Sequence, residues 1–433
     1  MGGNDDHGKD AEDAIENACL EALLPDYVVR APKYKKEGAG PVEVADILIP
    51  FRNTLFVIQA KSRRLPPKLA EVTARELKEL EDRIDKAVVQ VGTIRETLSK
   101  QVLSQVKTSN GIWIPFDSTQ FTRVVGIVIL DINCTDEQEK IKKDISLLAG
   151  FTQRESIPIH IFMKKDFQLL VAELDTPADL ERYLAIREKL LTEGKLVRLF
   201  SEKDLLATVI CRNDIVETTL AEPKAMLILE DGLWEAINAD KSGEFALRNQ
   251  RRRNSKVFDE IIIRMHTAIG HVPDAAKDTK LSFVTNPTVE QYRNIIETLS
   301  TLNRAQRIIV AESIIKNAQG ADTVERGYRY FAFDPQDGNC AFLFLMSRQP
   351  RTERIKTLNI LARAAYIKFR RRTVVAIGIP NFSAEGSSID TMLIQNIPIP
   401  TEPEIVEAAE SYFGNVSTRT EDEWGNISDV PSK

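Results

Sequence analysis

The sequence is poor in cysteine and histidine, with four residues of each type among 433. The cysteines lie far apart and form no CxxC pair, which excludes a local zinc cluster and a disulfide-stapled scaffold. The histidines form no HExxH motif, and His266 and His271 lie five residues apart, off a common helical face. We therefore expect a reducing, cytoplasmic location.

Long hydrophobic runs and the common phosphate-binding motifs are also missing. No run of about eighteen apolar residues occurs, which excludes a membrane-spanning helix, and the polar, acidic start gives no sign of a secretory or transit peptide. The chain has no GxxxxGK[ST] motif, and Gly38-Ala39-Gly40 precedes an expected strand rather than a helix. With 43% hydrophobic and 28% charged residues, the composition fits a soluble globular protein with a sizeable core.

The chain is long enough for two or three domains. Hydrophobic spacing predicts helices over 9–24, 69–107, 141–148 and 180–191, and strands over 27–31, 42–50, 55–60, 112–116, 124–132 and 157–163. Beyond these, it predicts helices over 245–268, 289–318 and 354–370, and strands over 328–333, 340–347 and 373–379. We therefore expect an α/β domain over 1–195, a mixed α+β domain for recognition or oligomerisation over 196–400, and an acidic flexible tail over 401–433.

Polar residues interrupt the apolar strands at one place. Asp46 lies within one apolar strand, and Gln59-Ala60-Lys61 closes the next. A two-residue turn at Arg52-Asn53 pairs Asp46 directly with Gln59, with their Cβ atoms about 5 Å apart. Gln59 and Lys61 are two residues apart and project from the same face of their strand. We therefore expect a carboxylate, an amide oxygen and an ammonium group close together.

This set of side chains suits metal-assisted phosphodiester hydrolysis. Mg²⁺ prefers oxygen ligands, and Asp46, the amide oxygen of Gln59 and the main-chain carbonyl of Ala60 can supply three. Lys61 can then orient the attacking water and offset the negative charge that develops on the phosphate. A carboxylate of the preceding helix can support the metal or its waters. We prefer Glu16, which precedes the apolar stripe of that helix, with Glu12 on the same face as the alternative.

The helical glutamate, the strand aspartate and Ile58-Gln59-Ala60-Lys61 together resemble the PD-(D/E)xK, or restriction-endonuclease-like, superfamily, in the QxK variant of Mrr-type nucleases. The resemblance implies a central mixed sheet flanked by helices and a nuclease that uses Mg²⁺ or Mn²⁺. It makes Asp46 and Gln59 metal ligands, Lys61 the catalytic lysine, and Glu16 or Glu12 the helical acid. It also makes Gln90, on the helix after the lysine strand, a weaker candidate beside the alternative of a solvated glutamine. Gln59 replaces the family's more common Glu or Asp and so removes one charge from the metal site.

Basic side chains gather around the expected site although the formal net charge is −6. Those that flank it, and that we expect to contact nucleic acid, are Lys33, Lys35, Lys36, Arg63, Arg64 and Lys68. Two arginine triplets lie further along the chain, at Arg251, Arg252 and Arg253 and at Arg370, Arg371 and Arg372. For these triplets, contact with phosphate and a merely solvated surface are equal alternatives. The negative average is thus compatible with a local positive channel.

The sequence therefore predicts a metal-dependent nuclease, an endonuclease-like hydrolase of phosphodiester bonds. DNA is favoured over RNA as the substrate, and the resemblance implies a role in prokaryotic restriction or anti-phage defence. One alternative is a catalytically decayed nuclease fold that acts as a nucleic-acid-binding or assembly subunit. A second is that these polar residues face water at a sheet edge, and a third is a protein-interaction module. A homo-oligomer and a separate partner subunit both stay open.

Overall fold

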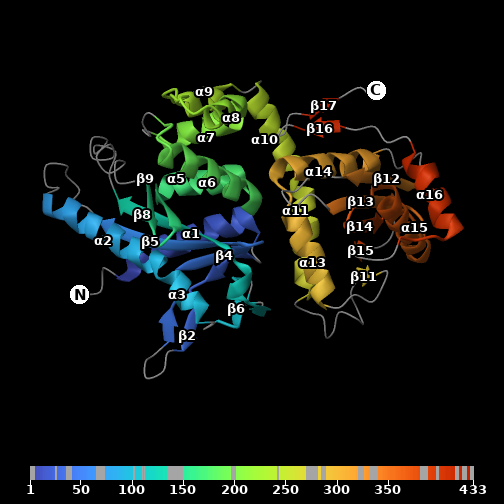
Figure 1. Cartoon of the computed structure of the whole chain (residues 1–433), viewed down its shortest axis with the longest axis horizontal. Coiled ribbons are helices and arrows are strands. Elements are labelled where there is room, and N and C mark those ends of the chain that lie inside the picture. The colour runs from blue at the N-terminus through green and yellow to red at the C-terminus, as the bar shows by residue number, and fades with distance from the viewer. Residues whose placement is uncertain are drawn as a thin grey trace. The chain divides into compact units, whose positions relative to one another are not determined.

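The chain divides into two compact units, Met1–Phe245 and Ala246–Lys433 (Figure 1). The computed structural model describes residues 5–24, 27–35, 41–64, 74–100, 103–109, 111, 113–133, 150–196, 201–240, 243–269, 281–283, 289–319, 326–331, 340–380, 389–395, 399–414, 419–421 and 427–429. Within these ranges, no helix is both long and apolar enough to cross a membrane.

A mixed sheet in the order β1-β4-β5-β8-β10-β9 forms the centre of the first unit. Its strands are β1 (Val29–Arg30), β4 (Ile47–Phe51), β5 (Thr54–Arg64), β8 (Arg123–Asn133), β9 (Gly150–Arg154) and β10 (Ile157–Met163). β4 and β5 form an antiparallel hairpin, whereas β5 pairs with β8, and β8 with β10, in parallel. The expected mixed α/β sheet flanked by helices is confirmed.

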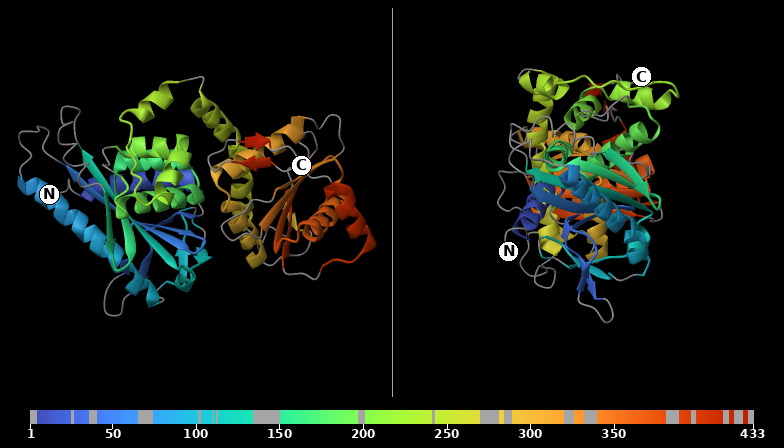
Figure 2. Two further views of the ribbon diagram at one scale, coloured as in Figure 1. Left: turned by 45° about the horizontal axis from the view of Figure 1, so that its top comes forward. Right: turned by 90° about the vertical axis from the view of Figure 1, so that its left-hand side faces the viewer.

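Helices cover both faces of this sheet, as the left view of Figure 2 shows. They are α1 (Asp5–Leu23), α5 (Lys164–Leu174) and α6 (Pro177–Thr192) on one face, and α2 (Ala74–Gly92) on the other. α2 crosses over between the parallel strands β5 and β8. Its buried Leu80, Ile84, Ala87 and Val91 recur at helical spacing and pack on the sheet. Gly126 of β8 leaves room for this helix, because a Cβ there would lie 2.5 Å from Cγ1 of Val91.

The helix expected over 69–107 is shorter than predicted. α2 ends at Gly92, a short α3 (Ile94–Ser99) follows, and 105–107 is strand β6 (Gln105–Lys107), paired with β7 (Trp113–Pro115). In β6 only Val106 is buried between exposed neighbours, which is the alternation of a strand that is covered on one face. Residues 69–73 and the helix expected over 141–148 lie outside the described residues.

The first unit also extends past the boundary that we expected at 195. It includes α7 (Glu202–Cys211), α8 (Asn213–Ala221) and α9 (Leu233–Ala239). The physical reason is a buried ion pair, in which Arg187 of α6 donates to both carboxylate oxygens of Glu202 in α7. Because both side chains are buried, the helical segment cannot separate from the sheet without leaving two unpaired charges.

A second sheet, in the order β11-β15-β14-β13-β12, forms the centre of the second unit. Its strands are β11 (Leu281–Phe283), β12 (Arg326–Phe331), β13 (Cys340–Ser347), β14 (Thr373–Pro380) and β15 (Ile389–Gln395). Its helices include α10 (Glu244–Asn254), α11 (Lys256–Ile269), α13 (Val289–Ser300), α14 (Arg304–Gln319), α15 (Arg351–Phe369) and α16 (Pro403–Phe413). α15 crosses over between the parallel strands β13 and β14, and its aliphatic side chains pack on the sheet.

The acidic tail that we expected from 401 begins instead with the folded helix α16. Ile405, Ala408, Ala409 and Phe413 are buried at four-residue and three-residue spacing and join the core formed by α15 and the sheet. The strongly acidic composition hid this apolar stripe, since Glu404, Glu407 and Glu410 occupy the exposed positions between its members. The expectation of a flexible tail is thus corrected for residues 403–413.

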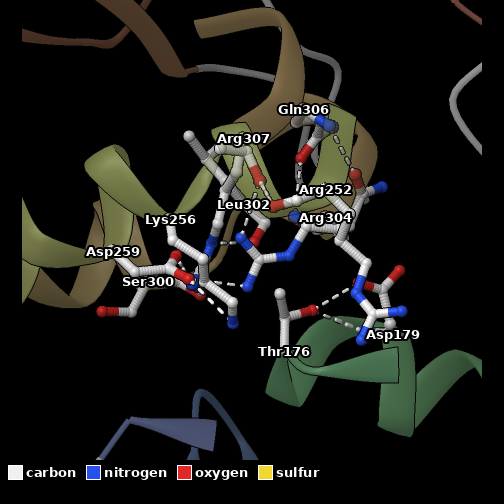
Figure 3. Close-up of polar contacts among 12 residues, drawn as sticks. Thr176, Asp179, Arg252, Lys256, Asp259, Ser300, Leu302, Arg304, Gln306 and Arg307 are labelled. Carbon is white, nitrogen blue, oxygen red and sulfur yellow. Dashed lines mark hydrogen bonds and ion pairs between the residues drawn. The ribbon is translucent and has the colours of Figure 1, made fainter. Parts of the chain in front are cut away.

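A buried ionic cluster joins α11 to α14 in the second unit (Figure 3). Asp259 accepts from Nη2 of Arg304 and from Nη1 of Arg307, each at 2.8 Å. Arg307 also donates to the main-chain oxygens of Leu302 and Ser300, both at 2.9 Å. Every charge in the cluster is thus paired, which is the condition under which buried charges are tolerated.

The two units share one order of elements. In the first, helix α1 precedes the hairpin β4–β5, the crossover helix α2 and the parallel strand β8. In the second, helix α14 precedes the antiparallel pair β12–β13, the crossover helix α15 and the parallel strand β14. Both units therefore present the carboxyl end of a central strand beside the start of a crossover helix.

Candidate active site

The hairpin β4–β5 has the turn and the register that the sequence predicts. Ile47 pairs with Ile58 and Phe51 with Thr54, which leaves Arg52 and Asn53 as the two-residue turn. Arg52 has a φ of 52°, the left-handed conformation that tight hairpin turns require. The ladder ends at Ile47, so the expected pairing of Asp46 with Gln59 lies one residue beyond it; the predicted turn and the pairing of the two strands are confirmed.

Asp46 is fixed at the start of β4 by two backbone hydrogen bonds. Its carboxylate Oδ2 accepts from the main-chain N–H of Ala60 at 2.6 Å, and its own carbonyl accepts from the N–H of Ala31 at 2.8 Å. Burial raises the pKa of Asp46, whereas the Lys61 ammonium and the Ala60 N–H act in the opposite direction. The carboxylate is therefore held against the strand that carries the lysine.

Gln59 and Lys61 lie on one face of β5, as their spacing predicts. Val57 and Leu55, two and four residues before Gln59, pack against α2, so alternation directs Gln59 and Lys61 to that side of the sheet as well. Nζ of Lys61 donates to Oε1 of Gln59 at 3.1 Å. Gln59 is only 4% exposed, and this bond satisfies its buried amide oxygen.

The two helical carboxylates have different surroundings. Both oxygens of Glu16 are engaged, Oε2 by Nη1 of Arg30 at 2.6 Å and Oε1 by the Ser109 hydroxyl at 2.7 Å. Burial and the charges of Asp46 and Glu43 raise the pKa of Glu12, whereas those of Arg30 and Lys61 act in the opposite direction. The structure thus ties Glu16, our preferred residue, to Arg30 and Ser109, and leaves Glu12 as the helical carboxylate near the charges of Asp46 and Lys61.

Glu43 is a further carboxylate at this place, and our sequence reasoning missed it. It ends β3 (Pro41–Glu43), which pairs with β2 (Lys33–Lys35), and its carboxyl group lies near that of Asp46, whose charge raises the pKa of Glu43. In one continuous strand, residues three apart point to opposite faces. The chain bends between Glu43 and β4, and this bend brings the two carboxyl groups together. No periodic signal in the sequence announces such a bend.

The expected nucleic-acid contacts are only partly described. Lys33 is exposed and lies 3.8 Å from Glu43, whereas Arg63 pairs with Glu79 of α2 at 2.5 Å. Lys35 and Arg64 are the last residues of β2 and β5, and their side chains lie outside the described part of the structure. Lys36 and Lys68 lie outside the described residues. Lys33 and Arg63, the two whose side chains are described, thus each lie beside an acidic side chain.

Gln90 is not brought to the site. It is exposed near the end of α2, where the adjacent Val91 packs on Gly126. Gly126 pairs with Val57, four residues before Lys61 on β5. Four strand residues span about 13 Å, so this candidate lies too far along the sheet to share a small ion with Lys61.

The arginine triplets both belong to the second unit. Arg251 forms a two-pronged ion pair with Glu312, with Nε–Oε1 at 2.6 Å and Nη2–Oε2 at 3.1 Å. Arg371 is half-buried and lies beside Tyr330, and Arg370 takes a left-handed conformation at the end of α15. Arg252 is half-buried, and Arg253 and Arg372 are exposed. The members with defined partners thus have structural roles within their own unit.

Burial and like charges raise the pKa of the carboxyl groups near Lys61. Burial raises the pKa of Glu43 and the charge of Asp46 raises it further, as is the case for Glu12. Within the described ranges, no group of three or more His, Cys, Asp or Glu side chains forms a ready metal cage. Mg²⁺ does not need one, because it is usually held by one or two carboxylates and keeps several waters.

The geometry thus defines one candidate site, at the edge where α1, the end of β3 and the hairpin β4–β5 meet. It combines acidic oxygens, a buried amide oxygen and a lysine. Comparison with known proteins adds no further assignment: no family model, no curated protein and no solved structure matches the chain.

Proposed function

We propose that this protein is a metal-dependent nuclease that hydrolyses phosphodiester bonds, with DNA as the favoured substrate. The first unit would then be a restriction-endonuclease-like domain, and the QxK form would be represented by Gln59 and Lys61. The observation that carries this proposal is the register of the β4–β5 hairpin, which sets Asp46 against the strand segment of Gln59 and Lys61. Restriction or anti-phage defence is the biological setting that we propose for this activity.

The residues present fit a hard divalent cation. Asp46 and Glu12 offer carboxylate oxygens, Gln59 offers an amide oxygen, and Ala60 offers its main-chain carbonyl. When bound, Mg²⁺ or Mn²⁺ would polarise the phosphate and offset its charge in the transition state. Lys61 would have to exchange its hydrogen bond to Gln59 for one to the phosphate or to the attacking water, a movement of a long and flexible side chain.

Cleavage assays with purified full-length protein test the proposal directly. Supercoiled plasmid, single-stranded DNA and RNA are incubated with Mg²⁺, with Mn²⁺ or with EDTA. We expect metal-dependent cleavage of DNA by the wild type. Lys61→Ala and Asp46→Asn should each lower the rate by about 100-fold or more, the usual cost of losing one group that stabilises developing charge.

Matched controls separate the site from general effects of mutation. Lys189→Ala and Asp214→Asn change exposed residues of the same types in α6 and α8, and both variants should cleave like the wild type. If Lys61→Ala and Asp46→Asn cut as fast as these controls, the assignment of the site is wrong. Phage resistance can be compared in cells that carry the wild type and in cells that carry Lys61→Ala. Equal resistance would argue against a defence role for this chemistry.

A catalytically decayed nucleic-acid-binding or assembly subunit is the second candidate function. Two contacts favour it, since the Ala60 N–H occupies one oxygen of Asp46 and Lys61 occupies the amide oxygen of Gln59. This alternative predicts salt-dependent binding of DNA with no cleavage under any metal condition. Filter binding across a salt series, on the preparations used for the cleavage assays, distinguishes the two.

A further inference from the structure

Arg30 connects the helix and the strand that together build the candidate site. It is the last residue of β1, and its guanidinium reaches across to α1. There Nη1 bonds to Oε2 of Glu16 at 2.6 Å, and Nη2 forms an ion pair with Asp13. Because two carboxylates share one planar fork of donors, the contact fixes the rotation of α1 as well as its distance from β1.

The same residue lies beside Asp46 on the strand side. Arg30 pairs with Ile47 in the β1–β4 ladder, and the next residue, Ala31, donates its N–H to the carbonyl of Asp46 at 2.8 Å. Arg30 is therefore adjacent in the chain to the group that holds Asp46, while its side chain holds α1. One residue sets the separation between the strand carboxylate and the helix.

The two partners of Arg30 on α1 follow Glu12 within about one helical turn. Asp13 is the next residue, and Glu16 follows one helical turn later on the same face. The Ser109 hydroxyl holds the second oxygen of Glu16, so this turn of the helix is fastened at two points. Glu12 lies one turn before Glu16 on that face, and burial and the charges of Asp46 and Glu43 raise its pKa.

We propose that Arg30 is a positioning residue that holds Glu12 of α1 against Asp46 so that the two carboxylates can bind one divalent cation. The inference rests on the proposed function, since it concerns the same site. It assigns Glu16 and Asp13 to fastening the helix and leaves Glu12 as the helical carboxylate that faces the metal.

Direct binding of Mn²⁺ tests this inference apart from any activity. The full-length wild type, Arg30→Ala and Arg30→Lys are titrated with Mn²⁺ by calorimetry, after circular dichroism has shown that each variant is folded. We expect Arg30→Ala to raise the dissociation constant by about 10- to 100-fold, the usual effect of removing a residue that orients metal ligands. The dissociation constant of Arg30→Lys should lie between those of the wild type and Arg30→Ala, because one ammonium group cannot span both carboxylates.

Arg123→Ala is the matched control. Arg123 also begins a strand of this sheet and pairs with a helical glutamate, Glu188, at 3.0 Å, but it lies at the opposite end of β5, beside Thr54. This variant should bind Mn²⁺ like the wild type. In cleavage assays, Arg30→Ala should need more Mg²⁺ for half-maximal rate and approach the wild-type rate when Mg²⁺ is saturating.

A second set of variants keeps the inference testable if Arg30→Ala fails to fold. The double variant Asp13→Asn with Glu16→Gln removes the partners of Arg30 and should weaken Mn²⁺ binding to a similar extent. Glu12→Gln should weaken it at least as much. The inference is overturned if folded Arg30→Ala binds Mn²⁺ as the wild type does. It is equally overturned if Glu16→Gln abolishes binding while Glu12→Gln leaves it intact.

Failure of this inference and failure of the proposed function are distinguishable. A wild type that cleaves DNA, together with an Arg30→Ala variant that matches it in Mn²⁺ binding and Mg²⁺ dependence, overturns only the role of Arg30. A wild type that neither binds Mn²⁺ nor cleaves overturns both.

Discussion

Arg187 and Glu202 form an ion pair in which the guanidinium makes three contacts of 2.9–3.1 Å with the carboxylate. Arg187 is fully buried, and Glu202 is exposed by only 6% at its side chain. Tyr183 donates to the same carboxylate, and Arg187 also contacts Nδ1 of His160 at 3.1 Å. This pair joins α7 to α6 and, through His160 of β10, to the sheet of the first unit.

Removal of one partner of this pair should strongly destabilise the first unit. We expect Arg187→Met to lower the free energy of unfolding by about 3–5 kcal/mol, because it leaves the Glu202 carboxylate buried without its counter-charge. Urea denaturation followed by circular dichroism measures this. The exposed pair of Arg182 and Glu217 supplies the control, and Arg182→Ala should cost less than about 1 kcal/mol. Similar costs for both variants would contradict the role given to the buried pair.

The Asp259 cluster should make the second unit sensitive to acid. Burial alone would raise the pKa of Asp259, but the guanidinium groups of Arg304 and Arg307 outweigh it and hold the pKa well below its usual range. The stabilisation is therefore fully present above the ordinary carboxyl pKa of about 4 and is lost as the pH falls below it. Asp259→Asn should destabilise by about 3–5 kcal/mol at pH 7, with a smaller difference from wild type at pH 3. A difference that does not change with pH would refute this linkage.

Gly126 should tolerate no side chain, whereas Gly150 in the same sheet should accept one. A Cβ at Gly126 would lie 2.5 Å from Val91 and 3.0 Å from Ile159, while one at Gly150 meets nothing within 4 Å. We expect Gly126→Ala to cost about 1–3 kcal/mol through overpacking beneath α2. Gly150→Ala should change stability by less than about 0.5 kcal/mol. Thermal unfolding of the two variants, measured side by side, tests this. Equal unfolding midpoints would contradict the close approach of Val91 in α2 to Gly126.

Divalent cations should stabilise the fold through the candidate site. If Mn²⁺ binds only the native state, a concentration about 100 times its dissociation constant raises the free energy of unfolding by about 2.7 kcal/mol. We expect this gain in the wild type and in Asp214→Asn, and its loss in Asp46→Asn or after addition of EDTA. Unfolding midpoints with and without Mn²⁺ give the answer. An equal gain in Asp46→Asn would place the cation elsewhere.

The hairpin could be predicted from the sequence because its geometry depends on local features alone. A two-residue turn fixes which residues of β4 and β5 face each other, and alternation then assigns their faces. The relative positions of Asp46, Gln59 and Lys61 could therefore be predicted by counting residues from the turn. The resemblance to a nuclease superfamily, by contrast, stays a prediction.

The choice between Glu12 and Glu16 could not be made from the sequence. Both lie on one face of α1, and what distinguishes them is Arg30, which reaches the helix from a separate strand. The first unit extends past the expected boundary at 195 for a similar reason, since the contact between Arg187 and Glu202 joins two helices across a linking segment. Long-range polar contacts of this kind leave no periodic trace in the sequence.

Strand β13 of the second unit can be compared with β5, which carries the polar residues Gln59 and Lys61. Strand β13 occupies the same place in the order of elements, between an antiparallel partner and a crossover helix, and the face toward that helix carries Ala341, Leu343 and Leu345. The second unit therefore shows, within the same chain, which side chains pack this face of such a strand against its crossover helix. Aliphatic side chains suffice to pack that face, so stability alone does not demand the amide and the ammonium group of Gln59 and Lys61.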